Sequence, residues 1–265
     1  MTERTFAGYR LHEVLGRGAS ATVVRAEAPD GRAVALKIPH PHAQGAHLER
    51  EAARAMAVRS PRVVAVHAVV QQGRDRALVL ELVRGRPLSE LALDGVDPAA
   101  VAVVASDLAA ALEAIHAARD GGAELGLVHG DVSPGNVLVD AGGRAKLTDL
   151  GLSRRRALSA LSQSGAIQGT VGYVAPEVIR GRPVTARADV FAMGVIVHEL
   201  LSGRRAFEGR TDLERLRATI ERPLEPLAGP LGGWVGVCTH KRPERRPADG
   251  AAAARALGLA ISAPS

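Results

Sequence analysis

The chain has 265 residues and a mass of 27.6 kDa, and 46% of its residues are hydrophobic, so it can bury a substantial core. This length permits one large domain or two modest ones and excludes a long solenoid. The net charge of +6 comes from 34 basic and 28 acidic residues spread along the chain. We interpret these charges as solvated surface and expect no nucleic-acid partner, because aromatic residues for base stacking make up only 2%.

The single cysteine, Cys238, excludes a disulfide framework or a cysteine-rich zinc site built from this sequence. The first residues contain no apolar run of signal-peptide length, and no stretch reaches the ~20 apolar residues that cross a bilayer. The Ala-rich stretch over residues 248–260 is interpreted as a closing core helix. We therefore expect a cytoplasmic protein with no membrane segment in this chain.

Residues 9–83 are predicted to form an antiparallel sheet of about five strands. Short runs rich in β-branched residues alternate with turns, in the order YRLHEVLG, ATVVRAEA, AVALKI, VVAVHAVV and ALVLELV. One main helix interrupts them over residues 48–58, where apolar residues recur at helical spacing until Ser60 and Pro61 end it.

From Asp97 onward the chain is predicted to be mostly helical, as in PAAVAVVASDLAAALEAIHAAR and ADVFAMGVIVHELLSG. A β-rich first third followed by an α-rich remainder indicates an α+β protein of two lobes with a cleft between them. We expect the first lobe over residues 9–83 and the second over residues 84–258.

The run LGRGASATVV places Gly16 and Gly18 between two strands, where bare backbone can bring N–H groups against phosphate oxygens. A simple two-glycine hairpin turn explains the same pattern. In the strand AVALKI, Lys37 stands among apolar neighbours, where it needs an anion or a carboxylate. Glu51 on the following helix is a candidate partner, and Glu49 is another that charge alone does not exclude.

The most informative stretch is LVHGDVSPGNVLV, which is followed by KLTDLGLS. It places Asp131 and Asn136 five residues apart in one loop, and Asp149 after another strand. Such a set can provide one base and the ligands of one or two magnesium ions. Each residue taken singly also fits a polar turn with capping side chains.

With these motifs, the chain resembles the protein kinase family, in particular the eukaryotic-like Ser/Thr kinases found in bacteria, over about residues 9–258. The resemblance rests on motifs in the family's order: GRGASATV, VALK, HGDVSPGN, DLG, GTVGYVAPE, ADVFAMG and RRP. It implies a bilobal kinase fold and phosphoryl transfer from ATP to Ser or Thr hydroxyls of proteins, with Mg²⁺ and with the chain itself as one candidate substrate.

The resemblance also implies a role for each residue of the site. Lys37, held by Glu51, would contact the α and β phosphates of ATP. Asn136 and Asp149 would hold magnesium, and Asp131 would accept the proton of the substrate hydroxyl. The preference for Glu51 over Glu49 comes from the family, whose glutamate lies about ten residues before a proline that precedes the next strand.

Further residues take family roles by position. The nucleotide would be surrounded by the glycine-rich loop, an apolar adenine pocket, a gatekeeper and the hinge backbone: Leu15, Gly16, Gly18, Val23, Ala35, Leu80, Glu81, Val83 and Leu138. Glu177 and Arg246 would form a structural ion pair, and Asp189 would brace the catalytic loop. These three are therefore not counted as chemical groups.

Three features depart from the family pattern. Gly130 replaces the arginine that pairs with an activation-loop phosphate, so we expect activity that does not depend strictly on loop phosphorylation. Ser133 replaces the usual lysine near the transferred phosphate, which predicts slow turnover or compensation by another cation, such as Lys146 or an arginine of residues 154–156. The segment over residues 117–126 is longer than usual. Candidate phosphorylation sites remain at Ser159, Ser162, Ser164 and Thr170.

Two other functions remain open at this point. His129, Gly130 and Asp131 also resemble the aminoglycoside and choline phosphotransferases, although the GTVGYVAPE segment and Arg246 favour a peptide substrate. The second is a pseudokinase that binds nucleotide or partners without transfer, which Gly130 and Ser133 favour slightly. The sequence does not identify the protein substrate or the regulator, and it is compatible with a homodimer.

Overall fold

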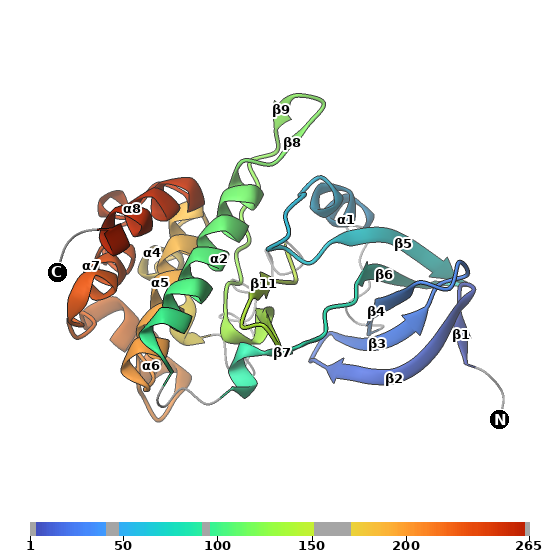
Figure 1. Ribbon diagram of the computed structural model, residues 1–265, viewed down its shortest axis with the longest axis horizontal. Helices are drawn as coiled ribbons and strands as arrows, with labels where there is room; N and C mark the ends of the chain where they lie inside the picture. The colour runs from blue at the N-terminus through green and yellow to red at the C-terminus, as the bar shows by residue number, and fades with distance from the viewer. Residues whose placement is uncertain (1–3, 41–47, 92–95, 151–170, 263–265) are drawn as a thin grey trace. The chain divides into compact units, whose positions relative to one another are not determined.

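The structure is a computed structural model that describes residues 4–40, 48–91, 96–150 and 171–262 (Figure 1). The chain divides into two compact units. The small unit comprises Met1–Arg59 and Val64–Arg84, and the large unit comprises Ser60–Val63 and Gly85–Ser265. The short segment Ser60–Val63 thus belongs to the large unit although it interrupts the small one.

The small unit is built on a six-stranded antiparallel sheet in the order β1-β2-β3-β4-β6-β5. The five strands expected from the sequence are present, together with a sixth, β1, and with the predicted helix α1. The elements are β1 (Thr5–Phe6), β2 (Tyr9–Arg17), β3 (Ala21–Glu27), β4 (Ala33–Pro39), α1 (Leu48–Met56), β5 (Val66–Gln72) and β6 (Asp75–Glu81).

The additional strand β1 is too short for an alternating pattern to reveal it. Phe6 pairs with Tyr9 across a tight turn in which Ala7 and Gly8 have φ values of 48° and 86°. The Phe6 side chain is only 7% exposed. Burial of this ring in the core therefore supports a two-residue strand that local propensity does not predict.

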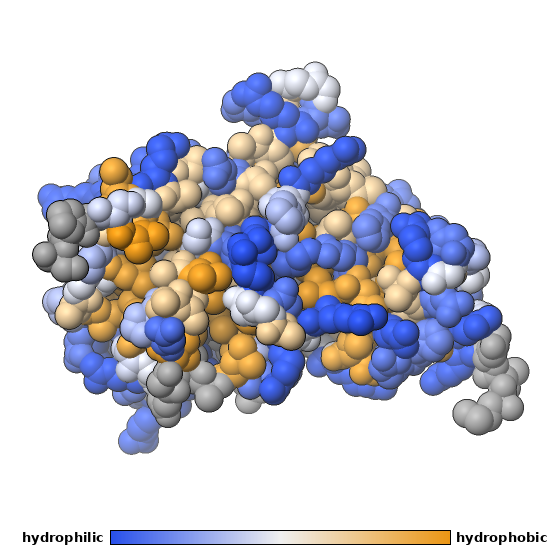
Figure 2. Space-filling model, viewed as in Figure 1, coloured by the Kyte–Doolittle hydropathy of each residue, from blue (hydrophilic) through white to orange (hydrophobic). Residues whose placement is uncertain are grey.

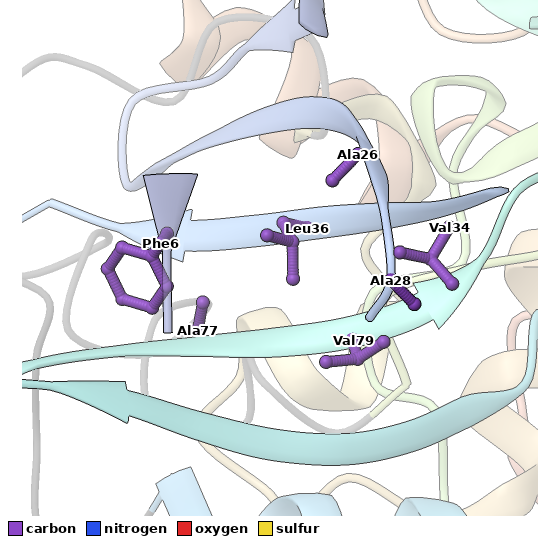
Figure 3. Packing of buried hydrophobic residues seen from close by; sticks show 7 residues of the cluster. All are labelled: Phe6, Ala26, Ala28, Val34, Leu36, Ala77 and Val79. Atoms are coloured by element: carbon purple, nitrogen blue, oxygen red, sulfur yellow. The ribbon is translucent and has the colours of Figure 1, made fainter. Parts of the chain in front are cut away.

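One face of the small unit's sheet carries its hydrophobic core (Figure 3). Because successive strand residues point to opposite faces, alternate residues of neighbouring strands meet there. The buried members of this cluster are Phe6, Ala26, Ala28, Val34, Leu36, Ala77 and Val79. The intervening residues of the same strands face the other way, which matters for the site described below.

The large unit is mainly helical. Its helices are α2 (Pro98–His116), α4 (Pro176–Ile179), α5 (Ala186–Ser202), α6 (Asp212–Glu221), α7 (Gly229–Cys238) and α8 (Gly250–Ser262). Helix α5 is buried on all sides between residues 188 and 200, as expected of a central core helix. Helix α2 packs against α5 and α8, and a Cβ on Gly250 would lie 2.1 Å from the backbone nitrogen of Glu113, so only glycine permits this approach.

Helix α2 is the one helix of the described part that is long and apolar enough to cross a membrane. Half of the apolar stretch of this helix is buried inside the protein, however. Its buried residues include Leu108, Leu112 and Ile115, and its neighbours are α5 and α8. These features are those of a core helix.

A small sheet in the large unit holds the segments that carry the predicted chemistry. Strand β10 (Val137–Asp140) pairs with β11 (Ala145–Leu147) on one side and with β7 (Gly85–Pro87) on the other. A 3-10 helix, η3 (Pro134–Asn136), leads directly into β10. The loop that contains Asp131 and Asn136 therefore ends where the β10–β11 hairpin begins.

The segment noted as unusually long forms a hairpin of β8 (Arg119–Asp120) and β9 (Ala123–Glu124) beyond the end of α2 (Figure 1). An ion pair of 2.6 Å joins Arg119 to Glu124. All four strand residues are exposed, and Figure 2 shows a mostly hydrophilic surface on this hairpin. The hairpin is therefore a solvated projection of the large unit.

Candidate active site

The loop that contains Asp131 is fixed by one buried carboxylate, that of Asp189 in the first turn of α5. Asp189 is 2% exposed and accepts hydrogen bonds from the backbone N–H groups of His129 at 2.7 Å and Gly130 at 2.8 Å. Its third donor is Nε2 of His116, at 2.9 Å. Since hydrogen bonds to a carboxylate are the stronger kind, this contact holds the loop firmly on α5.

His129 joins this loop to the residues before Asp149. Its ring is fully buried, and Nε2 lies 2.8 Å from the carbonyl oxygen of Thr148 while Nδ1 lies 3.2 Å from the N–H of Asp131. Only a ring with its proton on Nε2 satisfies both contacts. The N–H of Thr148 in turn donates to the carbonyl oxygen of Asn136 at 2.9 Å.

Asn136 stands beside Asp131 and restrains it. The Asn136 Nδ2 atom donates to the Asp131 carbonyl oxygen at 2.8 Å and to its carboxylate Oδ2 at 3.1 Å. Since both donor bonds of the amide are directed at Asp131, its Oδ1 atom is the acceptor that can face a cation. The arrangement brings Asp131, Asn136 and the backbone leading to Asp149 together.

Asp149 has a φ of 65°, in the left-handed region that is strained for a residue with a side chain. The side chain is half-buried. A conformation of this kind persists only where the surroundings fix it, and here Thr148 is fixed through both of its backbone groups. Strain at a chemically suited carboxylate is typical of a functional position.

The donor set fits a magnesium ion that also binds phosphate. Mg²⁺ prefers oxygen ligands and commonly takes one or two carboxylates or amides together with substrate phosphates. The Asp149 carboxylate and the Asn136 amide oxygen supply such ligands. Within the described residues no three His, Cys, Asp or Glu side chains cluster as an all-protein metal site.

The predicted phosphate and adenine contacts of the small unit lie on one face of its sheet. Val23 is paired with Lys37, and Ala35 with Leu80, so these four side chains point to the same side, opposite the core of Figure 3. Gly16 is paired with Val23, which places the glycine-rich turn at the end of this face.

The turn between β2 and β3 is closed by the Gly18 N–H, which donates to the Ala21 carbonyl oxygen at 2.9 Å. Leu15 before it is 49% exposed. A Cβ on Gly16 would meet no atom within 4 Å, so the backbone there is open to a ligand. This geometry fits both the phosphate-binding and the simple hairpin interpretation of the two glycines.

Of the two candidate partners of Lys37, Glu49 and Glu51, only Glu49 has a described side chain. Glu49 lies 3.4 Å from Arg76 in an ion pair of the small unit, so its charge is directed there. The side chain of Glu51 lies outside the described residues, although its backbone belongs to α1.

The remaining predicted nucleotide contacts come from both units. Glu81 ends β6, where its N–H donates to the Ala65 carbonyl oxygen at 2.9 Å. Val83 follows on the segment after β6, in the small unit. Leu138 is in β10 of the large unit, paired with Lys146 and Pro87.

Glu177 and Arg246 form a bidentate ion pair, with nitrogen to oxygen distances of 2.7 and 2.8 Å. They are 5% and 3% exposed. Glu177 lies in α4, and Arg246 follows the 3-10 helix η5 (Pro243–Arg245). The guanidinium also lies 4.8 Å from the ring centre of Phe191 in α5, so the pair joins three segments of the large unit.

A small hollow of about 30 Å³ lies beside Asp131 within the large unit. Apolar side chains line much of it, among them Val132, Val174, Val178 and Val184. Gly130 also lines it, with a φ of 76°.

Two of the departures from the family pattern are visible in this loop. Ser133 is 5% exposed and precedes η3, where its carbonyl oxygen accepts the N–H of Asn136 at 2.9 Å. Gly130 has only Val184 within 4 Å of where a Cβ would stand. The arginines of residues 154–156 and the candidate sites Ser159, Ser162, Ser164 and Thr170 lie outside the described residues.

His116 is a site residue that the sequence did not reveal. It donates from Nε2 to Asp189, and its Nδ1 accepts the N–H of Gly250 at 3.0 Å. It thus connects the end of α2 and the start of α8 to the carboxylate that holds the catalytic loop. A histidine in the last turn of an apolar helix gives no signal of this role, because its partners are 73 and 134 residues away.

Comparison with known proteins decides the family. The protein kinase domain model matches residues 9–230. The chain belongs to the protein kinase family. Curated relatives include the Ser/Thr protein kinase drp72 of Corynebacterium efficiens, 33% identical over 94% of this chain and 50% of that protein, and PkaB of Streptomyces coelicolor, 34% identical over 93% and 61%.

Ser/Thr protein kinase PknL of Mycobacterium tuberculosis is 33% identical over 96% of this chain and 65% of its own length. The chain therefore spans about half to two thirds of the length of these three relatives. A solved structure of Rad53 residues 1-466 in complex with AMP-PNP superposes with a TM-score of 0.75 and 25% identity, covering 94% of this chain and 64% of that one. The protein kinase fold is thereby confirmed.

Proposed function

We propose that this kinase transfers the γ-phosphate of ATP to Ser or Thr hydroxyls of proteins, with Mg²⁺. The observation that carries the proposal is the connection of Asp131, Asn136 and Thr148 through hydrogen bonds to one another and to His129. This connection joins the proposed base, Asp131, to Asn136 and to the backbone just before Asp149, and phosphoryl transfer depends mostly on such positioning.

Asp131 is the proposed base. Its carboxylate accepts the proton of the substrate hydroxyl as that oxygen bonds to the γ-phosphorus, while the bond from this phosphorus to the β–γ bridging oxygen breaks and ADP leaves. The hydrogen bond from Asn136 Nδ2 to Oδ2, at 3.1 Å, orients the carboxylate. The neighbouring backbone cannot shift freely, because Asp189 holds the two residues before Asp131.

Asn136 and Asp149 are the proposed magnesium ligands, and a bound Mg²⁺ would neutralise phosphate charge during transfer. Lys37 is proposed to bind the α and β phosphates, with Glu51 as its partner. The N–H groups around Gly16 and Gly18 would cover the phosphates. Val23, Ala35 and Lys37 share one sheet face, which supports a common ligand.

Adenine recognition is proposed for the apolar residues Leu15, Val23, Ala35 and Leu138, with Leu80 as gatekeeper. The backbone from Glu81 to Val83 would supply the hinge hydrogen bonds. An adenine pocket is mostly apolar with a few backbone partners, and Ala35 and Leu80 are 6% and 7% exposed. The proposed location is the cytoplasm, where ATP and Mg²⁺ are available.

The hollow beside Asp131 supports a polypeptide acceptor. Its lining includes residues of the segment from Tyr173 to Ala175 and of α4, which are held in place by Glu177 and Arg246. Autophosphorylation falls within the same chemistry. Because Gly130 has no guanidinium to pair with a loop phosphate, activity is proposed not to depend strictly on that phosphate. Because Ser133 is neutral, slow turnover or compensation by a cationic side chain elsewhere is proposed.

Incubation with γ-labelled ATP and Mg²⁺, alone, with a generic basic protein and with an aminoglycoside panel, tests this proposal. We expect label on Ser or Thr of protein. Label on an aminoglycoside would replace the proposal with a small-molecule phosphotransferase. Nucleotide binding without any transfer would replace it with a pseudokinase.

A further inference from the structure

A buried charged cluster lies in the large unit at the far end of the β10–β11 hairpin. Asp107 of α2 is 2% exposed. Its Oδ1 accepts from Arg62 Nε at 3.0 Å and from Arg144 at 2.6 Å, and its Oδ2 accepts from Arg144 Nε and from the Ala145 N–H, both at 2.9 Å. We call Asp107, Arg62, Arg144 and the Ala145 amide the Asp107 cluster.

The carboxylate of this cluster is stabilised in its charged form. Burial would raise the pKa of Asp107, but the hydrogen bonds from Arg144 and Ala145 and the charge of Arg62 outweigh it, so the pKa lies below its ordinary value. A buried ion pair is not by itself a reliable source of stability, and its best-attested use is to fix one arrangement of the chain.

Asp107 joins its own helix, α2, to two other segments. One is the start of β11. The other is Ser60–Val63, which follows α1 in the chain but belongs to the large unit. Arg62 is held at both ends, because its carbonyl oxygen accepts the Leu147 N–H at 2.8 Å. Val63 forms a parallel bridge with Leu147, so this segment lies along β11.

The other end of the same hairpin carries both proposed magnesium ligands. β10 begins immediately after Asn136, and β11 ends two residues before Asp149. The register pairs Val137 with Leu147. Only two residues, Lys146 and Leu147, separate Ala145 of the Asp107 cluster from Thr148, so a shift of β11 along its axis would move Asp149 relative to Asn136.

We propose that Asp107 is a positioning residue for the magnesium ligands, acting through Arg62, Arg144 and strand β11. This inference rests on the proposed function, since it concerns how the chain's own residues present their oxygen atoms to a magnesium nucleotide. Partners that orient metal ligands without touching the metal typically change metal affinity about 10- to 100-fold when they are replaced. The Asp107 cluster lies further from the metal ligands, so we expect the lower end of that range.

The test compares two ligands by titration calorimetry, one that needs the magnesium ligands and one that does not. The Asp107→Asn variant should bind Mg²⁺–AMP-PNP about tenfold more weakly than the unmodified chain. Adenosine, which carries no phosphate, should bind with unchanged affinity. Glu221→Gln makes the same acid-to-amide change in an exposed pair with Arg217, at 3.1 Å, and should change neither affinity.

A second variant keeps the test decisive if Asp107→Asn does not fold. Arg144→Gln removes two hydrogen bonds from a side chain that is 47% exposed, and the same loss of Mg²⁺–AMP-PNP affinity is expected. Equal weakening of both ligands, or of neither, in a folded variant would overturn the inference. If the unmodified chain bound adenosine but not Mg²⁺–AMP-PNP, the proposed function itself would fail.

Discussion

The N–H of Thr148 donates to the carbonyl oxygen of Asn136 over 2.9 Å, and this single bond ties the two proposed magnesium ligands together. Thr148 directly precedes Asp149 in the chain, and its carbonyl oxygen is held by His129 at 2.8 Å. The position of Asp149 relative to Asn136 is thus set by the backbone. Such a site is arranged before its ligand arrives, which is what electrostatic catalysis requires.

Replacement of His129 by Ala should uncouple Asp131 from Thr148. The Asp131 N–H and the Thr148 carbonyl oxygen would each lose a partner, at about 1–3 kcal/mol per buried group. A misplacement of 1 Å can cost about 100-fold in rate, so we expect kcat to fall about 100-fold in steady-state assays. The exposed His67 provides the control, His67→Ala, and equal rates for both variants would contradict the assigned role of His129.

Breaking the Glu177–Arg246 pair should cost stability rather than chemistry. In Glu177→Gln the buried guanidinium of Arg246 loses its counter-charge, for which about 3–5 kcal/mol is typical. Urea unfolding of this variant beside Glu221→Gln, in which the altered pair is exposed, measures the difference. A loss below about 1 kcal/mol, the usual range of an exposed pair, would show that the pair does not hold α4 in place.

Stability should fall in mild acid because of His198 in α5. Burial lowers the pKa of this imidazole below its ordinary value of 6.5, although a hydrogen bond to Glu225 and the nearby Glu199 act in the other direction. The unfolded chain therefore binds this proton more readily. The contribution of His198 is fully present above pH 6.5 and is lost as the pH falls through the lowered pKa.

Thermal unfolding between pH 7.5 and 5 measures this effect. His198→Gln keeps a side-chain N–H for the Glu225 carbonyl oxygen, which lies 3.3 Å from Nε2 in the native chain, and does not titrate in this range. We expect its melting temperature to fall less between the two pH values than that of the unmodified chain. An identical fall in both would assign the acid sensitivity to other groups.

Loop phosphorylation should not be required for activity. Gly130 supplies no guanidinium to pair with a phosphate, so joint replacement of Ser159, Ser162, Ser164 and Thr170 by Ala should leave the initial rate within about threefold. A matched variant that replaces only the three serines keeps the Thr170 side chain, so loss of a hydroxyl contact at position 170 cannot explain a change in its rate. Abolished transfer in both variants would show that a phosphate switch exists despite Gly130.

Much of the fold follows from local patterns in the sequence. Short runs rich in β-branched residues between turns placed β2 to β6 correctly, and the helical spacing of apolar residues placed α1. Strand β1 and the β8–β9 hairpin did not follow, because strands of two residues are too short to show a period. Their pairing depends on turn geometry and, for Phe6, on the buried core.

Some residues of the candidate site could also be predicted from the sequence, and others could not. Asp131, Asn136 and Asp149 were predicted as site residues because they lie close together in a recognisable order. His116 and Asp107 were not, because both lie on the largely apolar helix α2 and their partners are distant in the chain. Asp107, for instance, bonds to Arg144 and Ala145, which follow it in the chain by 37 and 38 positions. Only the folded structure brings them together.

The most direct test of the account is the transfer of labelled γ-phosphate to protein by the unmodified chain and by Asp131→Asn, with nucleotide affinity measured on both. The account predicts label on protein with the unmodified chain, a rate at least about 100-fold lower for the variant because the base is lost, and unchanged binding of Mg²⁺–AMP-PNP. Equal labelling by the two proteins, or binding without transfer by the unmodified chain, would contradict it.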